Sequence, residues 1–212
     1  IEHSVRPFIL VGGGVIRADA ADELREFVSK VQAPVADTLM GKGAFPGTDE
    51  LYTGMLGMHG TKTANFGVSQ CDLLVVLGAR FSDRVIGNAA KFASQAKIVQ
   101  IDIDRSEIDK NILTDHHIIG SAKRVLELLN QRVPQYHRDA WKEQILSLKR
   151  EPEVETSQVL TPRQVLETIR NLVPQDTIVA TDVGQHQMWA IQYCKRVKPN
   201  SFLTSGGLGT MG

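Results

Sequence analysis

Short apolar runs alternate along the chain with stretches whose apolar residues recur at helical spacing. The clearest run, residues 71–78, is nearly continuous, partly β-branched and closed by Gly78. Such a run is typical of a strand buried on both faces of a parallel sheet. Shorter apolar runs predict further strands at residues 8–11, 34–38, 97–103 and 117–120.

Helical spacing fills two of the intervals between these runs. In residues 18–31 the apolar side chains form one stripe, and Asp19 is the expected N-cap of the helix. A second helix is predicted from Ser121 to about Arg132. This alternation predicts an α/β fold with a doubly wound, mostly parallel sheet over residues 1–133.

The pattern then changes. Residues 134–160 are rich in charged and polar side chains, and we expect them to link two domains, with a helix over residues 138–150. Thr161-Pro162 is typical of a helix start. Together with strand-like residues 177–181, this start predicts a second, incomplete α/β unit over residues 161–212.

The chain ends in a glycine-rich run, residues 206–212, directly after strand-like residues 201–204. An α/β fold would next begin a helix at this point, so we expect the chain to end inside a domain. Residues 182–187 also follow a predicted strand. Backbone N–H groups in both turns could cradle a phosphate.

Composition excludes several classes of protein. Lysine plus arginine and aspartate plus glutamate both number 24, so the formal net charge at pH 7 is 0. This balance argues against a nucleic-acid partner, which requires a basic surface. No apolar run approaches the roughly 20 residues of a membrane helix. Cys71 and Cys194 lie far apart and indicate reduced thiols in a cytoplasmic setting.

Two strand ends carry features of nucleotide sites. Gly12, Gly13 and Gly14 follow a strand, where a dinucleotide fold brings backbone N–H groups to phosphate, although Arg17 replaces the last glycine of the full fingerprint. The alternative is a tight strand-to-helix turn. Asp102 lies where such sheets hold a ribose, and the alternative is a capping loop for residues 105–110.

Two loops are candidates for ligand contact. In residues 54–60, three glycines and two methionines surround His59, so the loop could approach a planar ligand, although a lone histidine is often structural. In residues 78–84, Arg80 and Arg84 follow the clearest strand and suggest phosphate or carboxylate binding. The alternative there is a solvated Arg–Asp cluster. From the residues alone, we predict a nucleotide-binding domain joined to part of a second ligand-binding unit.

Six motifs in fixed order resemble one family, the large catalytic subunit of acetolactate synthase. They are Gly41-Lys42-Gly43-Ala44-Phe45-Pro46, residues 54–60, residues 78–84, residues 100–104, residues 184–190 and residues 205–212. The resemblance implies the Rossmann-like middle domain of thiamine diphosphate enzymes at residues 1–133. It also implies the start of the thiamine diphosphate-binding domain at residues 161–212.

The resemblance also implies site residues by position. The flavin dinucleotide FAD would be contacted by Gly12, Gly13, Gly14, Thr38, Leu39, Met40, Leu56, Gly57, Met58, His59, Gly78, Ala79, Arg80, Asp83, Arg84, Val85, Asp102 and Ile103. Thiamine diphosphate would be contacted by Gly184, Gln185, His186, Gly209 and Met211. Arg84 would also bind the carboxylate of the second 2-oxoacid. Ser82 and Ser121 depart from the family, whose members often carry an acid at these positions.

The activity implied is condensation of two pyruvates, or of pyruvate and 2-oxobutyrate, with release of CO2. It is the first common step of branched-chain amino acid biosynthesis. The cofactors implied are FAD, thiamine diphosphate and Mg2+, with the Mg2+ ligands outside this chain. The full-length subunit would form a homodimer or homotetramer, and a small regulatory subunit is left open.

Two other functions remain open at this point. One is another thiamine diphosphate-dependent 2-oxoacid decarboxylase or oxidase, and the other is a non-catalytic nucleotide-binding module. The Met58-His59 loop and the Arg80/Arg84 pair favour the synthase, because relatives without flavin would not be expected to keep both.

Overall fold

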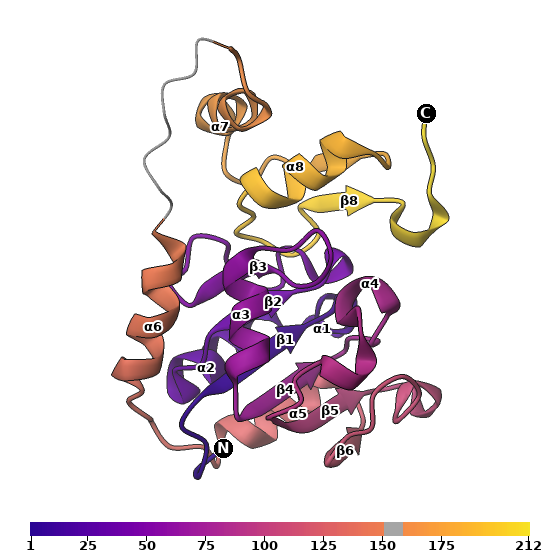
Figure 1. Cartoon of the computed structure of the whole chain (residues 1–212). Coiled ribbons are helices and arrows are strands. Elements are labelled where there is room, and N and C mark those ends of the chain that lie inside the picture. Colours follow the sequence, from indigo (N-terminus) through magenta and orange to yellow (C-terminus); the bar gives the residue numbers. More distant parts are fainter. Residues whose placement is uncertain (151–158) are drawn as a thin grey trace.

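A computed structural model describes residues 1–150 and 159–212 (Figure 1). Its first unit is a six-stranded sheet in the order β3-β2-β1-β4-β5-β6, and every pairing is parallel. The strands are β1 (Pro7–Val11), β2 (Val35–Asp37), β3 (Tyr52–Met55), β4 (Leu73–Leu77), β5 (Lys97–Asp102) and β6 (His116–Ile119). This topology confirms the predicted doubly wound sheet.

Helices cover both faces of the sheet. They are α1 (Gly13–Arg17), α2 (Ala21–Val31), α3 (Lys62–Gln70), α4 (Asp83–Ile86), α5 (Ala122–Asn130) and α6 (Asp139–Lys149), with the short 3-10 helices η1 (Leu39–Gly41), η2 (Ala89–Lys91) and η3 (Arg105–Glu107). Alternate residues of β1 point to opposite faces, so Ile9 and Val11 pack beneath α2 and α5, whereas Phe8 and Leu10 pack beneath α3 and α6.

The second unit contains α7 (Pro162–Leu172), β7 (Val179–Thr181), α8 (Gln185–Tyr193), β8 (Phe202–Thr204) and η4 (Gly206–Leu208). Its two strands pair in parallel. Figure 1 shows α8 lying against the β3 end of the large sheet, where Met55 joins Ile191 and Phe202 in one apolar cluster. Across the described parts of the chain, no helix has the length and apolar character needed to cross a membrane.

Most predicted elements are present within one or two residues of their predicted ends. The predicted Thr161 helix start is confirmed, because its hydroxyl accepts a hydrogen bond from the backbone N–H of Gln164 in a capping box. The N-cap prediction for Asp19 is wrong, since α2 begins after Ala20 and Asp19 itself adopts a left-handed φ of 50°. Strand β3 was not predicted. Gly54 and Met55 therefore belong to a strand and not to the loop expected there.

Helix α6 lies within the segment predicted to link two domains. It packs on the first unit: Trp141 and Ile145 are buried in the same apolar cluster as Phe8, and the Trp141 indole donates a hydrogen bond to the carbonyl of Pro7 at 2.9 Å. Residues 138–149 therefore fold back onto the first unit. Residues 151–158 of the predicted link lie outside the described residues.

Asp72 anchors the amino-terminal segment at the start of β4. Its carboxylate accepts hydrogen bonds from the Ser4 hydroxyl, from the Val5 amide at 2.7 Å and from the Arg6 amide at 3.0 Å. Partial burial alone would raise the pKa of Asp72, but these donors outweigh it and hold the pKa below its usual value.

We expect Asp72→Ala to lower the free energy of unfolding by about 1–3 kcal/mol at pH 7, because three donors lose a charged acceptor. Since the folded pKa is depressed, this contribution is present above the unfolded pKa and is lost as the pH falls through the folded value. Urea unfolding at pH 7 and in acid would measure both effects. Asp22→Ala is the control, because its side chain is 82% exposed; equal losses in the two variants would contradict the role of Asp72.

Candidate functional site

The carboxyl ends of the parallel strands lie at one edge of the six-stranded sheet. The segments predicted to contact FAD lie at or shortly after the carboxyl ends of the first five strands, so the fold brings them to that edge. The chain order reverses between β1 and β4, which are neighbours at the centre of the sheet. Open α/β sheets bind ligands at such a point.

The glycine turn after β1 is packed tightly against the turn after β4. A Cβ on Gly12 would lie 2.2 Å from the carbonyl oxygen of Gly78, and a Cβ on Gly14 would lie 2.6 Å from the Gly78 Cα. The Gly14 amide donates to the Gly78 carbonyl at 2.9 Å. This close packing requires glycine at both positions and engages the Gly14 amide. The phosphate role of Gly12, Gly13 and Gly14 stays a prediction.

Exposed side chains of two kinds gather along the edge. Met40, Met58 and Ile103 are 50%, 69% and 73% exposed, although each is large and apolar. Arg80 and Arg84 are exposed on the segment after β4. Apolar surface beside guanidinium groups suits a flat aromatic ligand that carries phosphate.

The loop after β3 holds the segment that carries Arg84. The Met58 amide donates to the Arg84 carbonyl at 2.9 Å. Gly57 has a φ of +108°, and a Cβ there would lie 2.4 Å from the same carbonyl oxygen. The Arg84 backbone is thus fixed, whereas its side chain reaches into solvent.

Two roles were predicted for the end of β5, a contact with ribose and a cap for the next helix, and the structure allows Asp102 and Asp104 to be considered separately. Asp104 caps η3 by accepting a hydrogen bond from the Ser106 amide at 2.9 Å, so it meets the capping alternative. Asp102 is buried, with Oδ1 accepting from the Asp104 amide at 3.0 Å. The ribose role of Asp102 stays a prediction.

The residues predicted to contact thiamine diphosphate lie at the corresponding edge of the two-stranded sheet. Gly184 has a φ of 155° and precedes α8, whose first residues are Gln185 and His186. The terminal run lies beside it, because the Val183 amide donates to the Thr210 carbonyl at 2.9 Å. In that run Gly209 has a φ of 67° and Met211 is 80% exposed.

The two edges adjoin each other. A Cβ on Gly206 would lie 3.0 Å from Sδ of Met40. The Gln192 side chain of α8 donates to the His59 carbonyl at 3.4 Å. The structure therefore brings the two predicted cofactor regions next to each other.

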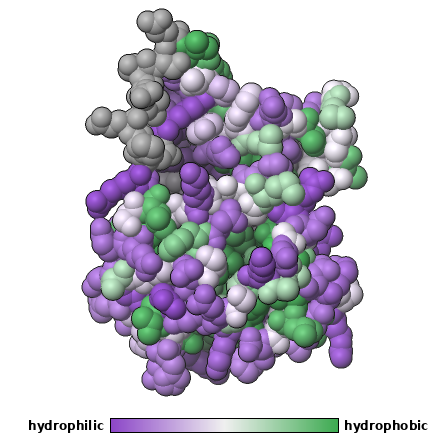
Figure 2. Space-filling model, in the orientation of Figure 1, coloured by the Kyte–Doolittle hydropathy of each residue, from purple (hydrophilic) through white to green (hydrophobic). Residues whose placement is uncertain are grey.

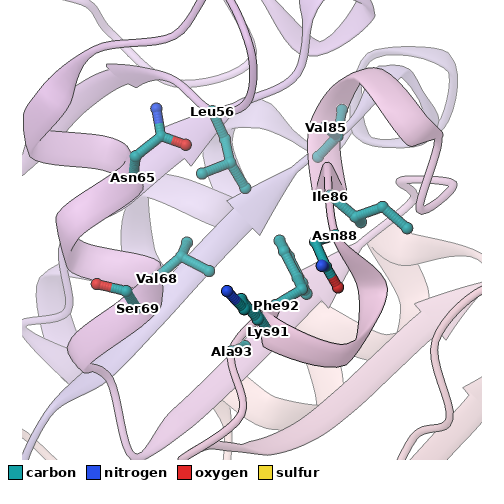
Figure 3. Close-up of a pocket in the computed structure, with 10 residues that line it drawn as sticks. All are labelled: Leu56, Asn65, Val68, Ser69, Val85, Ile86, Asn88, Lys91, Phe92 and Ala93. Carbon is teal, nitrogen blue, oxygen red and sulfur yellow. The ribbon is translucent and has the colours of Figure 1, made fainter.

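A small cavity of about 160 Å³ lies between α3 and the segment 85–93 (Figure 3). Leu56, Val68 and Phe92 form its apolar wall, and Asn65 and Lys91 lie at its rim. Figure 2 shows apolar residues among the hydrophilic ones on this face of the first unit, several of them in its middle. A cavity of this size is too small for a dinucleotide, which needs several hundred Å³.

Sequence reasoning missed one group of polar residues. Asp37, Lys42 and Tyr52 are buried and hydrogen-bonded to one another beside α8. The sequence signals were an aspartate at the end of a predicted strand and a lysine between two glycines in the motif at residues 41–46. Among the described residues, no cluster of three or more His, Cys, Asp or Glu side chains could hold a metal ion.

Comparison with known families assigns most of the chain to two domain families. Residues 1–129 match the family model described as "Thiamine pyrophosphate enzyme, central domain". The chain belongs to the thiamine pyrophosphate enzyme family. Residues 182–212 match the model described as "Thiamine pyrophosphate enzyme, C-terminal TPP binding domain".

Among thiamine pyrophosphate enzymes, the chain is similar to acetolactate synthase large subunits, as the motifs predicted. It is 47% identical to that of Parasynechococcus marenigrum over 100% of this chain and 35% of the relative. It is 45% identical to the probable subunit of Methanocaldococcus jannaschii, over 100% of this chain and 38% of the relative. The Haemophilus influenzae subunit is 41% identical, over 98% and 38%. The chain thus spans little more than a third of these relatives.

We expect Gly12→Ala to lower the free energy of unfolding by about 1–3 kcal/mol or to prevent folding, because its Cβ would overlap the Gly78 backbone. Thermal melting would measure the change. Gly120→Ala is the matched control after β6, since its Cβ would meet only Val125 at 3.8 Å. Equal melting temperatures in the two variants would show that the turns after β1 and β4 can move apart without loss of stability.

Proposed function

We propose that the chain is the flavin-binding central part of an acetolactate synthase, joined to the start of its thiamine diphosphate-binding domain. The substrates are 2-oxoacids: two pyruvates, or pyruvate and 2-oxobutyrate, give a 2-aceto-2-hydroxyacid and CO2. The observation that carries the proposal is the meeting of two strand edges at Met40 and Gly206. Similarity to acetolactate synthase large subunits along the whole chain favours this reaction over others that use thiamine.

The edge of the six-stranded sheet fits a flavin dinucleotide. Met40, Met58 and Ile103 offer exposed apolar surface to a flat ring, and the exposed Arg80 offers charge-assisted hydrogen bonds to phosphate. Asp102 would accept a hydrogen bond from a ribose hydroxyl. FAD, when bound, would be a structural element with no net redox part in the reaction.

The edge of the two-stranded sheet fits a diphosphate. Gly184 turns the chain into the amino-terminal end of α8, where backbone N–H groups and the helix dipole favour an anion. Gly209 and Met211 would line the pyrimidine. Thiamine diphosphate, when bound, supplies the electron sink for decarboxylation. Arg84 would hold the carboxylate of the acceptor 2-oxoacid through its planar guanidinium.

The proposal extends to the domain limits of this chain and to the assembly of the full-length subunit. The domain limits would be residues 1–133 and residues 161–212. Of residues 134–160, which join them, α6 packs on the first unit. Magnesium would be bound by residues outside this chain. The full-length subunit would work in the cytoplasm as a homodimer or homotetramer, with or without a small regulatory subunit.

We expect Arg80→Ala to weaken FAD binding by about 1.5–3 kcal/mol, because a charge-assisted hydrogen bond to phosphate is lost. Flavin absorbance retained after gel filtration would measure it, in a protein of the relatives' length that contains this chain. The control is Arg132→Ala. This exposed arginine follows α5, and α5 runs from the carboxyl ends of the strands back toward their amino ends, away from the predicted FAD site. Equal flavin retention in both variants would remove Arg80 from the site.

We expect Arg84→Lys in the same protein to lower kcat/KM for the acceptor step by about ten- to 150-fold, because lysine keeps the charge without the bidentate fork. Decarboxylation of the first pyruvate should change much less. Measuring both half-reactions decides the matter. A solvated charge cluster would instead predict less than about 1 kcal/mol and no preference between the two steps.

A further inference from the structure

Three ionisable side chains form a buried network where the two units meet. Asp37 at the end of β2, Lys42 after η1 and Tyr52 at the start of β3 are 0%, 4% and 7% exposed. The Tyr52 hydroxyl donates to Oδ2 of Asp37 at 2.7 Å, and Nζ of Lys42 donates to the Tyr52 oxygen at 2.9 Å. All three belong to the first unit.

Lys42 alone carries the network across to the second unit. Its Nζ also donates to the carbonyl oxygen of Ile191 at 2.7 Å. Ile191 lies in the last turn of α8, where the final carbonyls have no partner within the helix. A buried cation at this end satisfies one of those carbonyls and is favoured by the helix dipole.

The residues proposed to contact thiamine diphosphate lie at the opposite end of α8. Gly184 is its N-cap, and Gln185 and His186 are the first two residues of this helix, which is nine residues long and ends at Tyr193. The apolar contacts that join α8 to Met55 are non-directional and would allow the helix to slide. Hydrogen bonds have a direction and so fix the register of the helix. The exposed Gln192 side chain makes a long one, at 3.4 Å, to the His59 carbonyl, whereas the one from Lys42 is buried and 2.7 Å long. Because water does not compete with it, the Lys42 bond contributes more to the register.

We propose that Lys42 is a positioning residue: its ammonium holds the carboxyl-terminal end of α8 and thereby sets Gly184–His186 relative to the flavin edge at residues 38–40. The role in catalysis rests on the proposed function, whereas the contact itself does not. Burial raises the pKa of Asp37 and lowers the pKa of Lys42, and the attraction between the two side chains opposes both shifts, so each favours the charged form of the other.

The contact is tested without cofactors, by hydrogen exchange of the 212-residue chain read at residues 185–194. Lys42→Met keeps the stem of the side chain and removes the ammonium, so exchange there should be faster by about tenfold or more. Lys198→Met is the control, because this exposed lysine pairs with the exposed Asp176 at 3.7 Å. Unchanged exchange in Lys42→Met would overturn the proposal.

A second variant separates positioning from plain stability. Lys42→Met leaves Asp37 buried without its counter-charge, which destabilises the fold by itself. In Asp37→Asn/Lys42→Met no charge is left buried, so the melting temperature should recover while exchange across α8 stays fast. Recovery of both would mean that Lys42 acts on stability alone, and the proposal would fall.

A kinetic split tests the link to function in a protein of the relatives' length. The double variant should need about tenfold more thiamine diphosphate for half-saturation, with kcat at saturation unchanged. If α8 exchanges faster but half-saturation does not move, the contact does not position the cofactor. Absence of thiamine-dependent activity in the unaltered protein would instead count against the proposed function, and the exchange result would still stand.

Discussion

The close approach of the turns after β1 and β4 is the constraint on which the candidate site depends. Gly12, Gly14 and Gly78 bring two backbones so near that no Cβ fits between them, and Gly78 adopts a φ of +55° to allow it. These strands are neighbours at the point where the sheet reverses its order. The segments carrying Met40 and Arg80 leave the sheet on either side of this contact, so the contact sets the distance between them.

Much of the fold could be predicted because buried parallel strands are short apolar runs. Strand β3 escaped prediction because Thr53 and Gly54 interrupt its apolar character. Helix α6 was expected, but its burial was not, since only Trp141 and Ile145 point inward from a charged helix. The N-cap at Asp19 failed because the chain turns there with a left-handed residue and begins α2 two residues later.

The candidate site was predictable to a different degree. Residues that follow parallel strands must meet at one edge, so the positions of Gly12, Asp102 and Arg80 followed from topology alone. The network of Asp37, Lys42 and Tyr52 did not, because Lys42 reaches Ile191, 149 residues later in the chain. Such a contact depends on how two units dock, and hydrophobic periodicity carries no information about docking.

Helix α6 has a practical consequence for work on the first unit alone. The family match ends at residue 129, before this helix begins. A polypeptide cut there would lose Trp141 and Ile145, leave the Pro7 carbonyl without its indole donor and expose apolar surface under α3 to water. Exposed patches of this kind promote aggregation. An expression boundary chosen for this unit therefore belongs after Lys149, where the helix ends.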